Sequence, residues 1–187
     1  MTKNGILCDN GTSRVSLDPK KSDFDGINFV SHAHMDHLPS KNGGTILSSI
    51  ETNEIAELRG FKMENHVKSL ENFSLIDSGH ILGAKGLLFD DIFYTGDICT
   101  RDRGFLQGAK IPKCKTLITE CTFGLAEFIF PALDEIKKQV NELISELYGK
   151  GIPVILMGYQ LGKAQTITQL FGHWGPLYLH DSVKEMN

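Results

Sequence analysis

Three histidines and one aspartate occur within six residues, directly after a short apolar run. The run is residues 27–30, and the four side chains are His32, His34, Asp36 and His37. Neutral imidazole and carboxylate groups are the ligands of catalytic zinc sites, and gathering them in one loop is unfavourable without a cation to bind. We interpret the loop as a metal site that follows a strand. The alternative is a surface loop that is merely rich in histidine.

Two further predicted strands also end close to metal-ligand residues. Residues 73–76 precede His80, and residues 92–94 precede Asp97. Three such strand ends indicate convergence at one edge of a sheet. Taken singly, His80 could equally be a hydrogen-bonded structural histidine, and Asp97 the cap of a turn.

The irregular segment 99–115 carries five basic residues against one acidic residue. The basic residues are Arg101, Arg103, Lys110, Lys113 and Lys115. Such a run is usually a solvated loop. Because it follows Asp97 closely, contact with the phosphates of a nucleic acid is an equal alternative.

Length and composition fit one soluble globular domain. The chain has 187 residues, of which 41% are hydrophobic and 22% charged, and a net charge of −4 does not by itself indicate a nucleic-acid binder. The four cysteines form no C-x-x-C pair, which is typical of free thiols in a reducing cytosol. Because there is no secretory leader and no apolar run of about 18 residues, we expect a cytoplasmic protein without a membrane span.

The remaining pattern alternates strands and helices and indicates an α/β protein. A hairpin is predicted from strands 6–8 and 15–17 around the turn dipeptide at 10–11, and a second from strands 87–89 and 92–94. Further predicted strands are 45–47, 116–119, a buried strand at 154–157, and 177–179. Helices are predicted at 52–58, from Pro131 to Gly149, and after the segment 158–165 to about Phe171.

Five motifs resemble, in order, those of the β-CASP nucleases of the metallo-β-lactamase superfamily, which include the mRNA 3′-end processing factors. They are the histidine loop 32–37, Asp77–Gly83, Tyr94–Asp97, Thr119–Gly124 and Leu161–Gln165. The resemblance implies a four-layer αββα sandwich, abbreviated at its C-terminal end. Residues 1–187 would form one such domain, with about 176–187 resembling the start of a missing β-CASP insertion.

The same resemblance implies hydrolysis of phosphodiester bonds in RNA or single-stranded DNA at two Zn²⁺ ions. His32, His34 and His80 would hold the first ion, Asp36 and His37 the second, and Asp97 would bridge them. Asp36 and Glu120 would be catalytic, Glu120 by orienting a proton donor. Arg101, Arg103 and Lys163 would bind substrate.

The chain departs from the family pattern in its late histidines. The family has two further motifs that supply a metal ligand and a proton donor, and the contexts of His173 and His180 do not resemble them. We therefore expect an incomplete second zinc site and weak or no activity, unless a homo-oligomer, a complementary chain or a longer form supplies both groups. Two alternatives stay open: a hydrolase of small thioesters or lactams, and a catalytically idle subunit.

Overall fold

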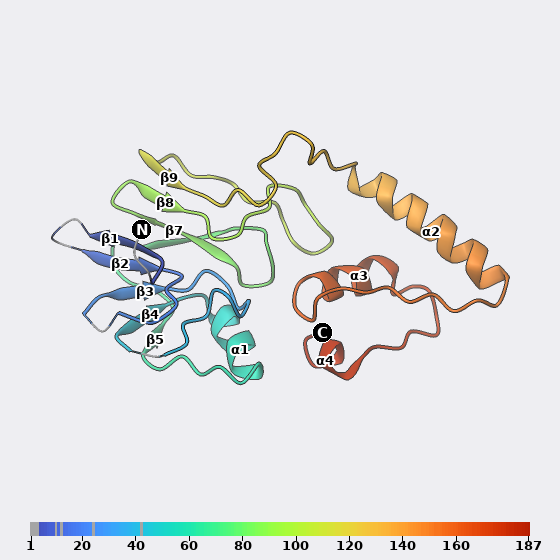
Figure 1. Ribbon diagram of the computed structural model, residues 1–187, viewed down its shortest axis with the longest axis horizontal. Helices are drawn as coiled ribbons and strands as arrows, with labels where there is room; N and C mark the ends of the chain where they lie inside the picture. Colours follow the sequence, from blue (N-terminus) through green and yellow to red (C-terminus); the bar gives the residue numbers. More distant parts are fainter. Residues whose placement is uncertain (1–3, 10, 12, 24, 42) are drawn as a thin grey trace. The chain divides into compact units, whose positions relative to one another are not determined.

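The computed structural model describes residues 4–187 except 10, 12, 24 and 42, and in this part of the chain it has nine strands and four helices (Figure 1). The chain divides into two compact units. The sheet unit comprises Met1–Asp102 and Leu106–Glu120, and the helical unit comprises Arg103–Phe105 and Cys121–Asn187. Both sheets and the first helix lie in the sheet unit, so the predicted mixture of strands and helices is confirmed.

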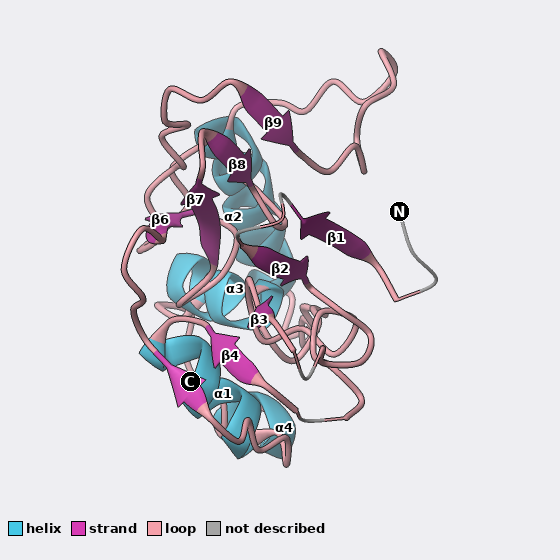
Figure 2. Cartoon of the chain, turned by 90° about the vertical axis from the view of Figure 1, so that its left-hand side faces the viewer, coloured by secondary structure: helices cyan, strands magenta, loops and turns pink. Residues whose placement is uncertain are grey.

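The first sheet has the strand order β1-β2-β3-β4-β5. Its strands are β1 (Ile6–Asp9), β2 (Arg14–Leu17), β3 (Ile27–Phe29), β4 (Thr45–Leu47) and β5 (His66–Val67). β1 and β2 form the predicted antiparallel hairpin, although Asn10 of its turn lies outside the described residues. From β2 to β5 the strands run parallel, each paired with the next. Figure 2 shows β1 to β4 following one another in this order. The segments that follow β2, β3 and β4 therefore emerge at the same edge.

The second sheet has the order β6-β7-β8-β9. Its strands are β6 (Ser74–Asp77), β7 (Lys85–Phe89), β8 (Ile92–Tyr94) and β9 (Thr116–Ile118). β6, β7 and β8 are antiparallel neighbours, and β8 and β9 are parallel, so β6, β8 and β9 share one direction. The predicted turn between β7 and β8 is confirmed. Asp90 and Asp91 there have φ values of 46° and 61°, as expected of a mirror-image hairpin turn.

One apolar core joins the two sheets. Its buried members come from β2, β3, β4, β7 and β8, and they are Val15, Leu17, Phe29, Leu47, Leu87, Phe89 and Tyr94. The rings of Phe29 and Tyr94 meet edge to face, with centroids 6.1 Å apart. Burial of these side chains determines which face of each strand points inward, and so sets the register of the strands. The register in turn determines where the loops at the strand ends lie.

Four helices complete the chain as described. They are α1 (Ile50–Leu58), α2 (Leu133–Gly149), α3 (Lys163–Phe171) and α4 (Asp181–Lys184). α1 begins two residues before the predicted start, because the Ser49 hydroxyl accepts from the Thr52 amide and caps the helix. α3 ends at Phe171 as predicted and begins at Lys163, inside the segment expected to precede it, where the Gln165 side chain accepts from the Gly162 amide. Across the described residues, no helix has the length and apolar character of a membrane span.

Two strand predictions in the helical unit are wrong. Residues 154–157 form no strand, and Ile155 and Met157 are 83% and 87% exposed. Residues 177–179 form no strand either. A run of β-branched and apolar residues favours burial in a sheet, but a strand exists only where another strand pairs with it, and in the described part of the helical unit none does.

Candidate metal centre

The histidine loop begins directly after β3, at the edge of the first sheet. His32 and Ala33 are fully buried, whereas the His34 side chain is only partly covered. The His37 amide donates to the His34 carbonyl at 3.0 Å, which closes the loop into a tight turn. The strand therefore leads directly into the loop, and the turn gathers the imidazoles on one side of it.

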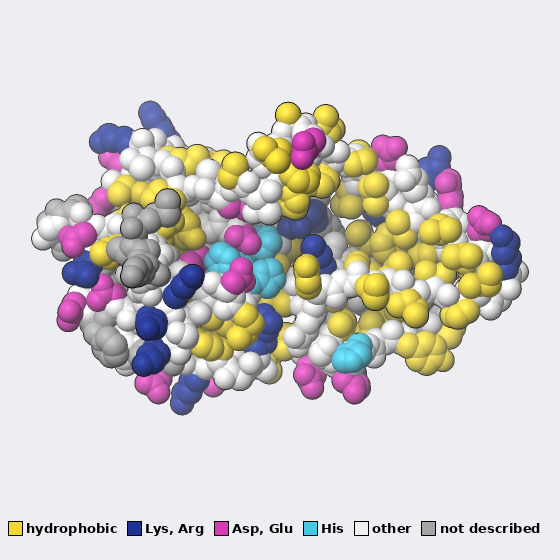
Figure 3. Space-filling model, viewed as in Figure 1, with side chains coloured by type: hydrophobic (Ala, Val, Ile, Leu, Met, Phe, Trp, Pro, Cys, Tyr) yellow, Lys and Arg dark blue, Asp and Glu magenta, His cyan; other side chains and the backbone are white. Residues whose placement is uncertain are grey.

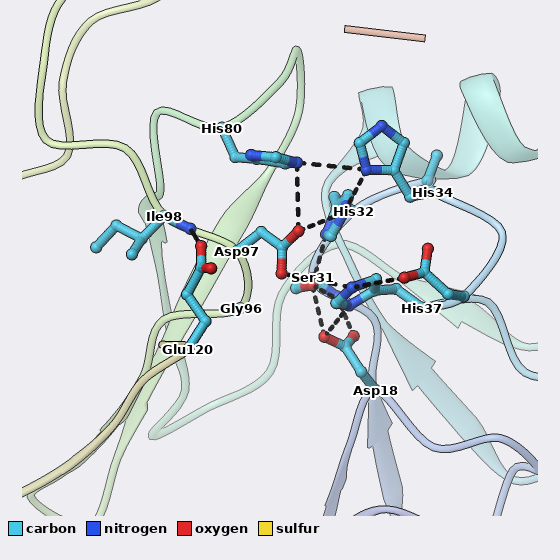
Figure 4. Close-up of polar contacts among 12 residues, drawn as sticks. Asp18, Ser31, His32, His34, His37, His80, Gly96, Asp97, Ile98 and Glu120 are labelled. Atoms are coloured by element: carbon cyan, nitrogen blue, oxygen red, sulfur yellow. Dashed lines mark hydrogen bonds and ion pairs between the residues drawn. The ribbon is translucent and has the colours of Figure 1, made fainter. Parts of the chain in front are cut away.

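Four donor atoms from three segments meet in front of this loop (Figure 4). We call His32, His34, His80 and Asp97 the four-donor group, because one ligand atom from each lies within 4.8 Å of all the others. His32 Nε2 is 2.9 Å from His34 Nδ1, and His80 Nε2 is 3.3 Å from the same atom. Oδ2 of Asp97 is 3.4 Å from His80 Nε2 and 3.8 Å from His32 Nε2.

These distances fit a tetrahedral cation. Zinc is bound by nitrogen and oxygen at about 2.0–2.2 Å, which places neighbouring ligand atoms of a tetrahedron about 3.3–3.6 Å apart. Of the four separations, 3.3 and 3.4 Å lie within this range, 2.9 Å is shorter and 3.8 Å is longer. Three imidazoles and a carboxylate are also the donor types that first-row divalent metals take. The four-donor group could therefore hold a metal ion.

Electrostatics favour the same interpretation. Burial, together with the neighbouring rings of His37, His80 and His34, lowers the pKa of His32 far below its ordinary value. Its imidazole is therefore neutral, as a metal ligand must be. Burial also raises the pKa of Asp97 above its ordinary value, against the opposing effect of His37. A cation among these groups would relieve the cost of keeping that carboxylate ionised.

A second, smaller set of donors adjoins the first. Oδ1 of Asp97 lies 3.5 Å from His37 Nε2, while its Oδ2 faces the four-donor group. Oδ2 of Asp36 lies 3.7 Å from the same His37 nitrogen, and the Asp36 side chain is 83% exposed. Asp97 is thus shared between two sets of donors. Among the described residues, the first set is the only group of three or more such side chains whose donor atoms all lie within 4.8 Å of one another.

The strand ends explain why donors so distant in sequence meet. His80 follows β6 and Asp97 follows β8, two strands that run in the same direction. The Lys85 amide at the start of β7 donates to the Ser31 carbonyl at 2.9 Å, which joins the second sheet to the histidine loop. On the surface of the molecule, histidine side chains and acidic side chains lie together (Figure 3).

Asp18 is a functional residue that the sequence reasoning missed. It follows β2, and its carboxylate accepts from the Ser31 amide at 2.7 Å and the Ser31 hydroxyl at 2.6 Å. It also accepts from the Tyr94 hydroxyl and from His37 Nδ1, each at 2.8 Å. An acid at a strand end directly before Pro19, comparable to Asp97 at the end of β8, is the signal that could have found it.

Asp18 sets the protonation of His37. Burial alone would lower the pKa of His37, but the hydrogen bond and charge of Asp18, with Asp97 and Asp36, raise it to about 8. A proton held on Nδ1 by Asp18 leaves Nε2 facing the two other carboxylates. Such a carboxylate partner fixes the tautomer and the ring orientation of a metal-binding histidine.

Glu120 lies beside the four-donor group. It follows β9, which runs parallel to β8, and its Oε1 accepts from the Ile98 amide at 2.8 Å (Figure 4). Glu120 therefore contacts the backbone directly after Asp97. A catalytic role for Glu120 stays a prediction.

The predicted substrate-binding residues are divided between the two units. Arg101 is exposed in the sheet unit, whereas Arg103 and Lys163 belong to the helical unit. The Lys163 ammonium lies 4.7 Å from the centre of the Tyr159 ring. The segment that carries Arg101 is joined to the His80 loop, because the Cys99 amide donates to a carbonyl of that loop at 2.9 Å.

Several known proteins have sequences similar to this chain. No family model matches the chain. The RNase J-like protein of Methanocaldococcus jannaschii is 27% identical over 209 residues, which cover 92% of this chain and 50% of that protein. The transcription termination factor FttA of the same organism is 29% identical over 104 residues, covering 50% of this chain and 16% of that protein.

A third relative, the probable DNA ligase of Opitutus terrae, is 28% identical over 153 residues, covering 74% of this chain and 15% of that protein. The chain spans half or less of the length of these three relatives. The alignment with the RNase J-like protein covers nearly the whole chain and so includes the four-donor group. By these similarities, the chain is related to the β-CASP nucleases of the metallo-β-lactamase superfamily.

Proposed function

We propose that the chain is a zinc-dependent phosphodiesterase that hydrolyses RNA or single-stranded DNA, in the manner of an mRNA 3′-end processing factor. The observation that carries the proposal is the four-donor group, in which three ring nitrogens and one carboxylate oxygen from both sheets meet within 4.8 Å. The names of the relatives, an RNase J-like protein and a transcription termination factor, support a nucleic-acid substrate. Arg101, Arg103 and Lys163 would contact its phosphates.

Each residue of the site would have its own task. The four-donor group would hold the first cation, and Asp36, His37 and Asp97 the second. A bound divalent cation supplies Lewis-acid stabilisation and a nucleophilic water near neutral pH. The exposed carboxylate of Asp36 would accept the proton that the attacking water loses. Glu120 would hold the backbone at Ile98, 2.8 Å from its carboxylate, and so keep Asp97 between the two sets of donors.

The second cation would bind more weakly than the first. Its donors are two carboxylates and one imidazole, with the remaining positions left to water, and such a site is the first to lose its metal on dilution or mild acidification. We expect low activity from this chain alone, and more where a second copy or a complementary chain completes the site.

The wider assignments are proposals of the same kind. Residues 1–187 would form one metallo-β-lactamase-like domain with the four-layer αββα arrangement, and residues 176–187 would resemble the start of a β-CASP insertion. The protein would act in the cytoplasm.

Metal content and cleavage, measured on the same preparations, test the proposal. Purified protein is assayed for bound zinc and for cleavage of labelled RNA and single-stranded DNA, with and without chelator. The variant is His80→Ala, and the matched control is His66→Ala, whose Nε2 lies 3.2 Å from the Ser48 carbonyl oxygen and which does not belong to the four-donor group. We expect His80→Ala to lose both zinc and cleavage, and His66→Ala to keep both.

Two results would contradict the proposal in different ways. Equal zinc content in His80→Ala and the unaltered chain would remove His80 from the metal site. Tightly bound zinc without cleavage of either nucleic acid would reject the nuclease, and cleavage of a thioester or lactam instead would establish the small-molecule hydrolase.

A further inference from the structure

Helix α1 contacts both histidine-bearing loops of the candidate metal centre, one at each end. It has nine residues, Ile50–Leu58, and so spans about 14 Å at 1.5 Å per residue. It follows β4 of the first sheet, and Thr52, Ile55 and Ala56 are its buried residues. None of its residues belongs to the four-donor group.

The N-terminal end of α1 holds the His80 loop. The hydroxyls of Ser49 and Thr52 lie 2.6 and 3.1 Å from the Gly83 carbonyl and donate to it. Both of these side chains are buried, so the two bonds are shielded from water. The loop between Ser78 and Ala84 is itself closed, because the Ser78 amide donates to the Ala84 carbonyl at 3.1 Å. Hydrogen bonds that fix the position of Gly83 therefore also restrict the position of His80, three residues earlier in the same loop.

The backbone at Gly83 lies so close to helix α1 that there is no room for a side chain at this position. Its φ is +77°, and a Cβ there would lie 2.6 Å from Glu51 Cβ and 2.9 Å from the Thr52 amide nitrogen. Glycine accepts both the conformation and the contact. The His80 loop is thus seated directly on the first turn of α1.

The C-terminal end of α1 holds the other histidine loop. Nη1 of Arg59, the residue that caps the helix, donates to the Ala33 carbonyl at 2.8 Å. Ala33 is fully buried and lies between His32 and His34 in the chain. A hydrogen bond from a charged donor to a carbonyl is among the stronger ones. It restrains the peptide that joins the first two histidine ligands.

We infer that α1 is a brace that sets the spacing between the His80 loop and the His32–His34 loop, with Thr52 and Arg59 as positioning residues of the metal site. The inference rests on the proposed function, since it requires the four-donor group to bind a metal. His80 Nε2 and His34 Nδ1 stand 3.3 Å apart, although the first belongs to the second sheet and the other to the first. Metal sites require placement within about 0.5 Å, and losing an outer partner of a ligand typically lowers metal affinity about 10- to 100-fold.

Cobalt(II) binding to the full chain tests the brace, because the cobalt spectrum reports the number and arrangement of ligands. The variants are Thr52→Val, which removes one hydroxyl at nearly constant volume, and Arg59→Met, which keeps the apolar stem. The controls remove similar groups elsewhere: Thr166→Val loses a hydroxyl that donates to the Gly162 carbonyl at 3.1 Å, and Arg14→Met loses an ion pair with Asp23 at 2.8 Å. Thermal unfolding of each metal-free variant measures how far the substitution destabilises the fold in the absence of metal.

We expect Thr52→Val and Arg59→Met each to weaken cobalt binding about 10- to 100-fold and to alter the spectrum. Neither control should do so. Thr52→Ser should restore the spectrum, because it keeps the hydroxyl. Arg59 is only partly buried, so Arg59→Met remains informative should the buried Thr52→Val fail to fold.

A crossed set of double variants tells which end of the brace serves which loop. If Thr52 acts through His80, Thr52→Val should weaken cobalt binding no further in a His80→Ala chain, whereas Arg59→Met still should. In a His34→Ala chain the expectation reverses. Unchanged cobalt affinity and spectrum in both single variants, with metal-free unfolding temperatures lowered as in the controls, would make α1 a structural element only. An unaltered chain that binds no cobalt at all would instead reject the proposed function, and the brace with it.

Discussion

Replacing Asp18 by asparagine should change how the stability of the metal-free protein depends on pH. Asp18 is the first charged partner that raises the pKa of His37 from 6.5 to about 8. A histidine whose pKa is higher in the folded chain adds stability that is fully present below pH 6.5 and is lost as the pH rises through 8. In Asp18→Asn the charge is gone, so this loss should disappear.

The size of the effect follows from the two pKa values. The pKa of His37 is about 8 in the folded chain and 6.5 in the unfolded chain, and this difference of about 1.5 corresponds to about 2 kcal/mol of unfolding free energy at low pH. Between pH 6.5 and 8.5, about 1.5 kcal/mol of this should be lost. This pH range is chosen to isolate the effect of His37. Below pH 6.5, the lowered pKa of His32 would itself reduce the stability of the fold. Above pH 8.5, ionisation of the Cys8 thiol, whose pKa is raised, would begin to change the stability as well.

Urea unfolding of chelator-treated protein at several pH values, together with NMR titration of the His37 ring, measures both quantities. Asp23→Asn is a suitable control, since Asp23 pairs with Arg14 and lies outside the set of acids that act on His37. A wild-type stability that stays flat across the window would refute the reasoning. The same slope in Asp18→Asn as in the wild type would show that another group supplies the dependence.

Three further predictions concern a glycine, the basic segment and the second cation. Gly83→Ala should lower the free energy of unfolding in urea by about 2–4 kcal/mol. Gly60→Ala should lower it less, because Gly60 has a similar positive φ but nothing within 4 Å of the added Cβ. Equal losses in the two variants would mean that the contact of Gly83 with α1 is unimportant. Neutralising Arg101 and Arg103 together should lower the salt dependence of single-stranded RNA binding by about one phosphate contact each, and an unchanged slope would mean a merely solvated segment. Equilibrium dialysis should retain one zinc per chain and release a second at low micromolar free zinc or below pH 6, so two ions released together would contradict unequal sites.

The sequence was most informative where local chemistry and strand periodicity agree. The first hairpin, the hairpin at Asp90–Asp91 and the helix after Gly162 depend on turn and cap residues, and all three are confirmed. The convergence of His80 and Asp97 on the histidine loop followed from where their strands end. The prediction placed the three strand ends at one edge of a single sheet, but β3 lies in the first sheet and β6 and β8 in the second, where they point the same way on either side of the antiparallel β7.

What the sequence could not supply depends on contacts between distant segments. Asp18 resembles an ordinary turn aspartate until the fold brings Tyr94, 76 residues later, within 2.8 Å of it. The apolar run 154–157 has the composition of a buried strand, yet its burial depends on a pairing partner that a local pattern does not specify. The two-residue strand β5 is too short to produce any periodic signal.

The candidate metal centre draws its donors unequally from the chain, with a consequence for the unfolded state. His32, His34 and His37 are near neighbours in sequence, so they remain a local chelating group when the protein is denatured, whereas His80 and Asp97 join them only through folding. Metal bound by the unfolded chain offsets the stabilisation that native binding confers. The rise in unfolding temperature with added zinc should therefore level off, at the concentration where the denatured histidine loop itself begins to fill.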